Sequence, residues 1–107
     1  MSDRELLELA AKAAGIEVMR SRLDDPMQQD MLVRQSARNA HHNNGPWNPL
    51  TDDGDALRLA VKLGMFNEGM PNAVRLQWEL SQRGDPDPYA DTRRAIVRAA
   101  AEIGRQV

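Results

Sequence analysis

The stretch Val74-Arg75-Leu76-Gln77-Trp78-Glu79-Leu80 decides the fold class that we expect for this chain. Apolar and polar side chains alternate along it with the two-residue period of a strand that buries one face. We therefore predict a strand at 73–80, with Trp78 on its apolar face and in the core. A weaker alternation at 16–20 predicts a second strand, which lies beside the first or pairs with another neighbour.

Three helices are expected around this sheet, because three apolar stripes of helical period follow capping signals. Ser2 and Glu5 have the form of a capping box, and Gly15 is a natural stop. The short side chains of Thr51-Asp52-Asp53 can accept hydrogen bonds from a first helical turn, and Asp87-Pro88 combines a cap with a proline at the first helical position. The expected helices are residues 3–14, 53–63 and 88–105.

The remaining segments are assigned by their turn chemistry and by short apolar runs. Residues 24–40 could form a helix that opens at Asp25-Pro26 or a strand around Met31-Leu32-Val33, and we favour the strand. Residues 41–46 and 84–87 are rich in turn formers and are expected to be exposed loops. The predicted fold is one α+β domain over the whole chain, a small antiparallel sheet packed with about three helices.

Composition narrows the class of protein. The 107 residues suit one domain, and the net charge of −2 argues against a general nucleic-acid binder, which gains affinity by neutralising phosphates. With no cysteine, disulfides, thiolate metal sites and a cysteine nucleophile are excluded. No apolar run has the length of a signal peptide or of a membrane span. A soluble protein of the cytoplasm is expected.

Three segments together resemble the phage ABA sandwich domain, a family of small bacteriophage and prophage proteins. They are ELLELAAKAAGI at 5–16, WNPLTDDGDALRLA at 47–60 and TRRAIVRAAA at 92–101. The resemblance implies a sheet held between helices and carries no catalytic residues with it. The chain departs from the family at 19–44 and 65–85, where a function particular to this protein is expected to lie.

The sequence offers little that could support catalysis or hold a metal or cofactor. His41 and His42 are adjacent and lack further ligands of the kind that zinc needs. The acidic run at 52–55 fits the start of a helix better than a calcium loop, because the other ligands of such a loop are absent. No phosphate-binding loop, nucleophile elbow or metalloprotease motif is present. We therefore expect neither an enzyme nor a cofactor.

Five residues are candidates for contact with a partner or an anion. Arg94, Arg98 and Arg105 fall on one side of the last predicted helix, with Arg93 nearby, and could hold a phosphate or an acidic surface. The acidic net charge favours a solvated face instead. Trp47 either closes the core beneath a loop or anchors an interface.

The expected function is that of a non-enzymatic phage or prophage accessory protein. It would bind a host or phage protein, for example to inhibit a host defence or regulatory complex. The alternative is a nucleotide- or nucleic-acid-binding module that uses Arg93, Arg94 and Arg98. A homodimer is a further expectation, because the edge of a strand at 73–80 has to be covered by another strand or a second subunit.

Overall fold

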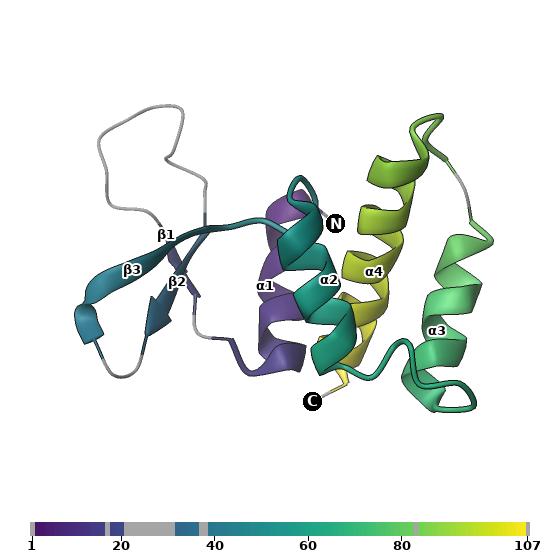
Figure 1. The fold of residues 1–107 in the computed structure, drawn as a ribbon, viewed down its shortest axis with the longest axis horizontal. Coiled ribbons are helices and arrows are strands. Elements are labelled where there is room, and N and C mark those ends of the chain that lie inside the picture. Colours follow the sequence, from purple (N-terminus) through teal and green to yellow (C-terminus); the bar gives the residue numbers. More distant parts are fainter. Residues whose placement is uncertain (1, 17, 21–31, 37–38, 83, 107) are drawn as a thin grey trace.

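The structure, a computed structural model, describes residues 2–16, 18–20, 32–36, 39–82 and 84–106, and it describes side chains only outside 17–46. Four helices and three short strands follow one another along the chain (Figure 1). Their order is α1 (Asp3–Ala14), β1 (Val18–Arg20), β2 (Leu32–Ser36), β3 (Asn39–Trp47), α2 (Asp53–Lys62), α3 (Pro71–Leu80) and α4 (Pro88–Arg105).

The three helices predicted from capping signals are confirmed, α1 and α4 at both ends and α2 to within one residue. The side chains of Ser2, Asp52 and Asp87 are the N-caps, and each accepts a hydrogen bond from a backbone N–H of its first turn. Gly15 ends α1 with a φ of 68°, a conformation that glycine adopts without strain. Local hydrogen-bonding chemistry thus fixes these helix boundaries.

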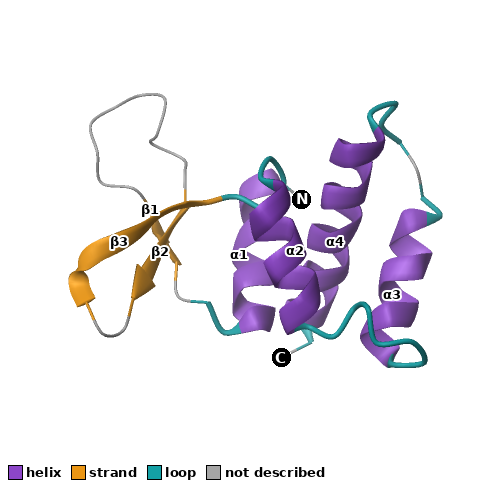
Figure 2. Cartoon of the chain, in the orientation of Figure 1, coloured by secondary structure: helices purple, strands orange, loops and turns teal. Residues whose placement is uncertain are grey.

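The predicted α+β fold class is wrong, because residues 73–80 lie in a helix. Pro71 occupies the first turn of α3, and the helical period buries Leu76 and Glu79 while leaving Trp78 52% exposed. The prediction that Trp78 lies in the core is therefore also wrong. The packed body consists of four helices, and in the described part of the chain no sheet lies between them (Figure 2).

The three strands pair with one another to one side of the helices (Figure 2). Both pairings are antiparallel, with Val18 opposite Arg34 and Leu32 opposite Trp47. The segment 41–46, predicted as an exposed loop, is instead part of β3, because its backbone continues the pairing with β2 through irregular register shifts.

The other predictions for the segments near the strands are confirmed only in part. Of the strand predicted at 16–20, residues 18–20 form β1, and β2 lies inside the ambiguous segment 24–40. The proposed helix start at Asp25-Pro26 falls outside the described residues, as do the other residues of 21–31. The loop at 84–87 is irregular and exposed, as predicted.

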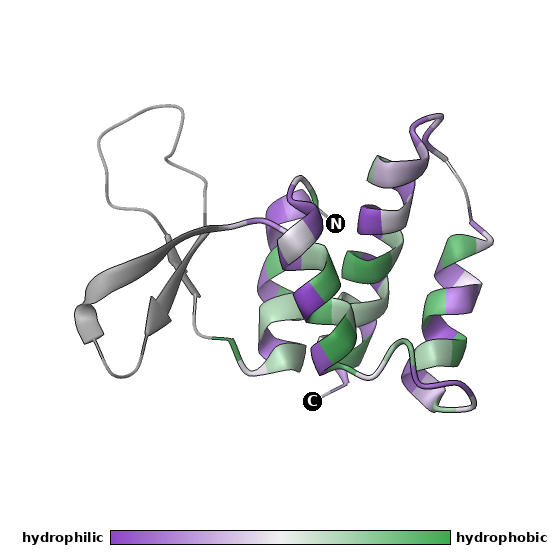
Figure 3. Cartoon of the chain, in the orientation of Figure 1, coloured by the Kyte–Doolittle hydropathy of each residue, from purple (hydrophilic) through white to green (hydrophobic). Residues whose placement is uncertain are grey.

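The helices α1, α2 and α4 run in the same direction and α3 runs opposite to them (Figure 1). Apolar residues gather where α1, α2 and α4 adjoin (Figure 3). Gly104 of α4 lies directly against the backbone of α1 at Leu9 and Ala13, and such an approach requires small residues on both helices. The buried alanines supply them: Ala10, Ala11, Ala14, Ala95, Ala99, Ala100 and Ala101.

Trp47, at the end of β3, is among the largest fully buried side chains of the described core, with 2% of its surface exposed. It belongs to the same buried cluster as Leu59 of α2 and Val97 of α4. Trp47 therefore closes the core, which is one of its two predicted roles, and it offers no surface to a partner in this conformation. None of the described helices is long and apolar enough to cross a membrane.

Candidate functional site

The four candidate arginines of α4 do not form one cluster. Arg94, Arg98 and Arg105 line one groove of about 310 Å³ that α1 and α3 complete. Arg93 points elsewhere: its Nε donates to the carbonyl oxygen of Leu50 at 2.9 Å and its Nη1 contacts the Asp53 carboxylate at 2.7 Å. Arg93 therefore ties α4 to the start of α2.

Carboxylates neutralise much of the arginine groove. Arg94 binds both oxygens of Asp3, at 3.0 and 3.3 Å, and this hydrogen bonding holds the pKa of Asp3 below its usual value and raises the pKa of Arg94. Glu102 contacts Arg105 at 3.4 Å and Arg75 at 3.3 Å. An incoming anion would have to compete with these carboxylates.

Arg98 differs from its neighbours, because it is exposed and makes no hydrogen bond or close ion pair with any residue that the structure describes. Two further carboxylates, Asp85 and Asp91, line a second hollow beside it. Beneath the arginines lies Glu79, whose pKa is raised by burial, although Arg75 and Arg98 oppose this effect. The arginine groove is thus a surface of mixed charge.

The acidic run before α2 has a structural role. The buried carboxylate of Asp55 accepts from the backbone N–H of Asn48 at 3.0 Å and from Arg58 at 2.8 Å. Asp52 accepts from the N–H of Asp55 at 2.7 Å, which is the predicted capping role. Among the residues that the structure describes, no group of three histidine or acidic side chains could hold a metal ion.

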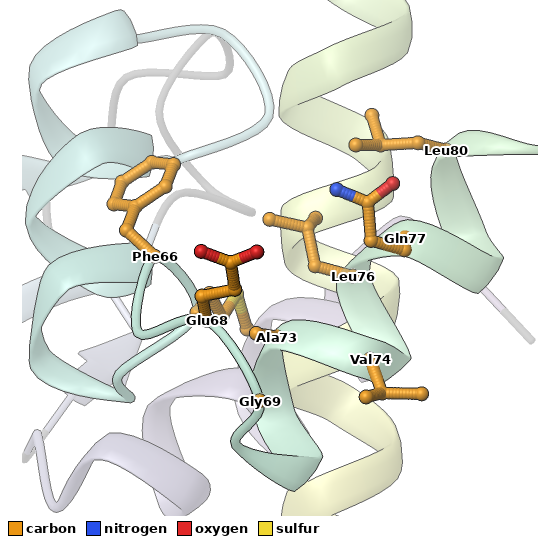
Figure 4. Close-up of a pocket in the computed structure, with 9 residues that line it drawn as sticks. Phe66, Glu68, Gly69, Ala73, Val74, Leu76, Gln77 and Leu80 are labelled. Carbon is orange, nitrogen blue, oxygen red and sulfur yellow. The ribbon is translucent and has the colours of Figure 1, made fainter.

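An apolar groove lies on the other side of α3, between this helix and the loop that precedes it (Figure 4). Its volume is about 460 Å³. Phe66 of the loop, 58% exposed, stands across from Leu76 and Leu80 of α3. We call this hollow the α3 groove, and its lining residues are Met65, Phe66, Glu68, Gly69, Ala73, Val74, Leu76, Gln77 and Leu80.

One charged side chain borders the α3 groove. The Glu68 carboxylate lies between the loop and α3, near Phe66 (Figure 4). It makes no ion pair or side-chain hydrogen bond with the described residues, and it is exposed to solvent. The groove therefore combines apolar walls with one acidic side chain that no described residue engages.

The most exposed positions of α3 carry no charge, unlike those of the other three described helices, although Arg75 is partly exposed and lies over the Trp78 ring. α1 exposes acidic and basic residues, and α2 and α4 each expose arginines. Along α3, by contrast, Met70, Val74 and Trp78 are 53%, 62% and 52% exposed. We call this surface the outer face of α3, and it consists of Met70, Pro71, Val74, Gln77, Trp78 and Ser81.

Sequence reasoning did not identify the α3 groove or the outer face. The relevant signals were that residues 65–85 differ from the family that the sequence resembles, and that Met65 and Met70 in this segment suit a partner-binding patch as well as gap-filling in the core. Both surfaces lie within that segment. The assignment of 73–80 as a strand concealed them, because a strand would have buried Val74 and Trp78 together.

No family model matches the sequence, and neither the curated proteins nor the solved structures contain a match. The resemblance to the phage ABA sandwich domain therefore stays a hypothesis. The central sheet that it implies does not lie between the helices of this structure.

Proposed function

We propose that this protein acts by binding another protein, and that the α3 groove is the binding site. The observation that carries the proposal is an open apolar hollow beside the one described helix whose exposed positions carry no charge. Apolar and aromatic surface with few charges is typical of the centre of a protein interface. A water-exposed side chain such as Phe66 gains free energy when a partner covers it.

The chemistry of the groove indicates what the partner presents. An apolar side chain would enter between Phe66 and Leu76, where it would be removed from water on both sides. A lysine or arginine one turn away would pair with Glu68, and Gln77 can donate to or accept from the partner backbone. A short segment with alternating apolar and basic residues meets these requirements.

The biological setting of the proposal comes from the family resemblance. In that setting the protein is a non-enzymatic phage or prophage accessory protein of the bacterial cytoplasm, and its target is a host or phage protein. Inhibition of a host defence or regulatory complex is the corresponding consequence. No cofactor takes part in this proposal.

Affinity capture with matched variants tests the proposal. Wild-type protein, Phe66→Asp and Val61→Asp are each used to retrieve proteins from infected cells. Phe66 and Val61 are similarly exposed, at 58% and 61%, so both variants should fold. A partner enriched by the wild type and by Val61→Asp but not by Phe66→Asp supports the groove. Equal capture by all three proteins, or no specific capture, contradicts it.

The alternative function as a nucleotide or nucleic-acid binder has one observation in its favour: Arg98 makes no hydrogen bond or close ion pair within the part of the chain that the structure describes. Thermal shift against nucleotides and oligonucleotides decides between the two functions. A salt-sensitive increase in melting temperature that disappears in Arg98→Gln would favour the alternative. The mixed charge of the arginine groove leads us to expect no response.

A further inference from the structure

Glu79 of α3 is a buried carboxylate without a hydrogen bond to any residue that the structure describes. Its side chain is 6% exposed, and its closest described cation, the Nε of Arg75, lies 3.9 Å from its Oε1, beyond hydrogen-bonding distance. Burial raises the pKa of this carboxyl, since the charged form is removed from water. Buried polar groups are almost always hydrogen-bonded, and a buried charge without a partner is costly. A ligand that donates to Glu79 would explain a carboxylate at this position.

Glu79 and Arg98 line the same groove, the arginine groove, from α3 and α4. Arg98 is exposed, and it makes no hydrogen bond or close ion pair within the described ranges of the chain. The other two arginines of the groove already contact the carboxylates of Asp3 and Glu102. The groove therefore offers a ligand one acidic acceptor and one cationic donor.

We propose that the arginine groove binds a free α-amino acid, whose ammonium group donates to Glu79 and whose carboxylate accepts from Arg98. A purely anionic ligand would be repelled by the glutamates of the groove, and a purely cationic one by its arginines. A zwitterion avoids both penalties, because each of its charges has an opposite charge to meet. The groove volume of about 310 Å³ is at the lower end for small-molecule sites, which suits a ligand of this size.

The remaining lining of the groove favours an aliphatic amino acid. Leu6 of α1 is the apolar residue among its described lining residues, and the arginine stems add further apolar surface. A second carboxylate on the ligand would approach Glu102, and a basic side chain would approach the arginines. Leucine is therefore the probe that we expect to fit.

Titration of the full chain with leucine, followed by two-dimensional amide NMR, tests the proposal. We expect a dissociation constant between about 10 µM and about 1 mM, since the ligand is small and the groove is open. Glu79→Gln and Arg98→Gln should each weaken binding by about 10-fold or more, because each removes a charge-assisted hydrogen bond. Lys62→Gln removes the same charge as Arg98→Gln at an exposed site on α2, and it should bind leucine as the wild type does.

Two analogues of leucine assign each end of the ligand to its side chain. N-acetyl-leucine lacks the ammonium group, so it should bind weakly and equally to the wild type and to Glu79→Gln. Leucinamide lacks the carboxylate, so it should bind weakly and equally to the wild type and to Arg98→Gln. Such paired changes in ligand and protein separate a direct contact from a general loss of binding.

Three results would overturn the amino-acid site. They are a wild-type protein that binds no leucine at about 10 mM, a Glu79→Gln or Arg98→Gln variant that binds leucine as the wild type does, and an N-acetyl-leucine affinity that Glu79→Gln lowers as much as it lowers that of leucine. Glutamine keeps the size of Glu79 and removes its buried charge, so this variant should fold, and circular dichroism confirms that each variant does.

The amino-acid site and the proposed function can fail separately. The arginine groove and the α3 groove lie on different sides of α3 and share no lining residue. Phe66→Asp should therefore abolish capture of the protein partner and leave the binding of leucine unchanged.

Discussion

Replacing Gly104 by alanine tests the close packing of α1 on α4. A Cβ atom at this position would collide with the carbonyl oxygen of Leu9, and it would lie 2.9 Å from the carbonyl carbon of Leu9 and 3.3 Å from the backbone nitrogen of Ala13. All three are backbone atoms of a helix, so no rotation of a side chain relieves the collision. The helix α1 has to move away from α4.

Two opposing contributions set the size of the effect. Overpacking a well-packed contact costs about 1–3 kcal/mol, and separating the helices also loosens the contacts around Ala10, Ala14 and Ala100, which adds about 1 kcal/mol for a void the size of one methyl group. Alanine is a better helix former than glycine by about 1 kcal/mol. We therefore expect Gly104→Ala to lower the free energy of unfolding by about 2 kcal/mol, which corresponds to a fall in Tm of roughly 10 °C for a chain of this size.

Thermal and urea unfolding followed by circular dichroism measure this loss, and Gly84→Ala is the matched control. A Cβ at Gly84 meets nothing within 4 Å and the residue does not have a positive φ, so this variant should be as stable as the wild type or slightly more stable. If Gly104→Ala matched or exceeded the stability of the wild type, helix propensity alone would explain it. The close approach of α1 and α4 would then be incorrect.

Three further predictions test the local structure and the electrostatics. Asp55→Asn should lower the free energy of unfolding by about 1–2 kcal/mol in urea titrations, because the buried carboxylate loses its charge-assisted hydrogen bonds; an unchanged midpoint would contradict that role. Arg94 lowers the pKa of Asp3 below 3.8 in the folded protein, so this pair stabilises the fold above the unfolded-state pKa and ceases to do so as the pH falls through the lowered folded-state value. Asp3→Asn should therefore reduce Tm more at neutral pH than in acid, and a reduction that does not shrink as the pH falls would argue against the ion pair. Trp78→Phe should leave only the shielded emission of Trp47, so strong acrylamide quenching of this variant would show that Trp47 is not buried.

The helices that the sequence predicted correctly are those whose ends are defined by neighbouring residues. Ser2, Asp52 and Asp87 accept hydrogen bonds from N–H groups two or three residues further along the chain, so the signal and the structure lie within one turn. Such short-range chemistry can be recognised from the residues alone.

The helix α3 could not be recognised in the same way. Its N-cap, Met70, makes no side-chain hydrogen bond, and the apolar residues between 74 and 80 satisfy a period of two as well as a helical period. Pro71 in the first turn was the one local signal for a helix. Burial of Leu76 against α4 decides the conformation, and that contact depends on residues far away in the chain.

For the candidate site, too, the sequence predicted the short-range features and not the long-range contacts. The spacing of Arg94, Arg98 and Arg105 was enough to place them on one side of a helix, and the structure shows them lining one groove. Their partners could not be predicted, because Asp3 lies 91 residues from Arg94 in the chain. Because carboxylates pair with these arginines, the arginine groove is a surface of mixed charge, whereas the α3 groove has mainly apolar walls.

The sequence by itself determined where three helices begin and end, since capping and stop signals act through hydrogen bonds within a single turn. Only the tertiary structure decided that residues 71–80 are helical and that Trp47 is buried while Val74 and Trp78 are exposed. The physical reason is that burial is a property of the assembled helices. An apolar side chain such as Val74 suits a core and an interface equally well until its neighbours are in place.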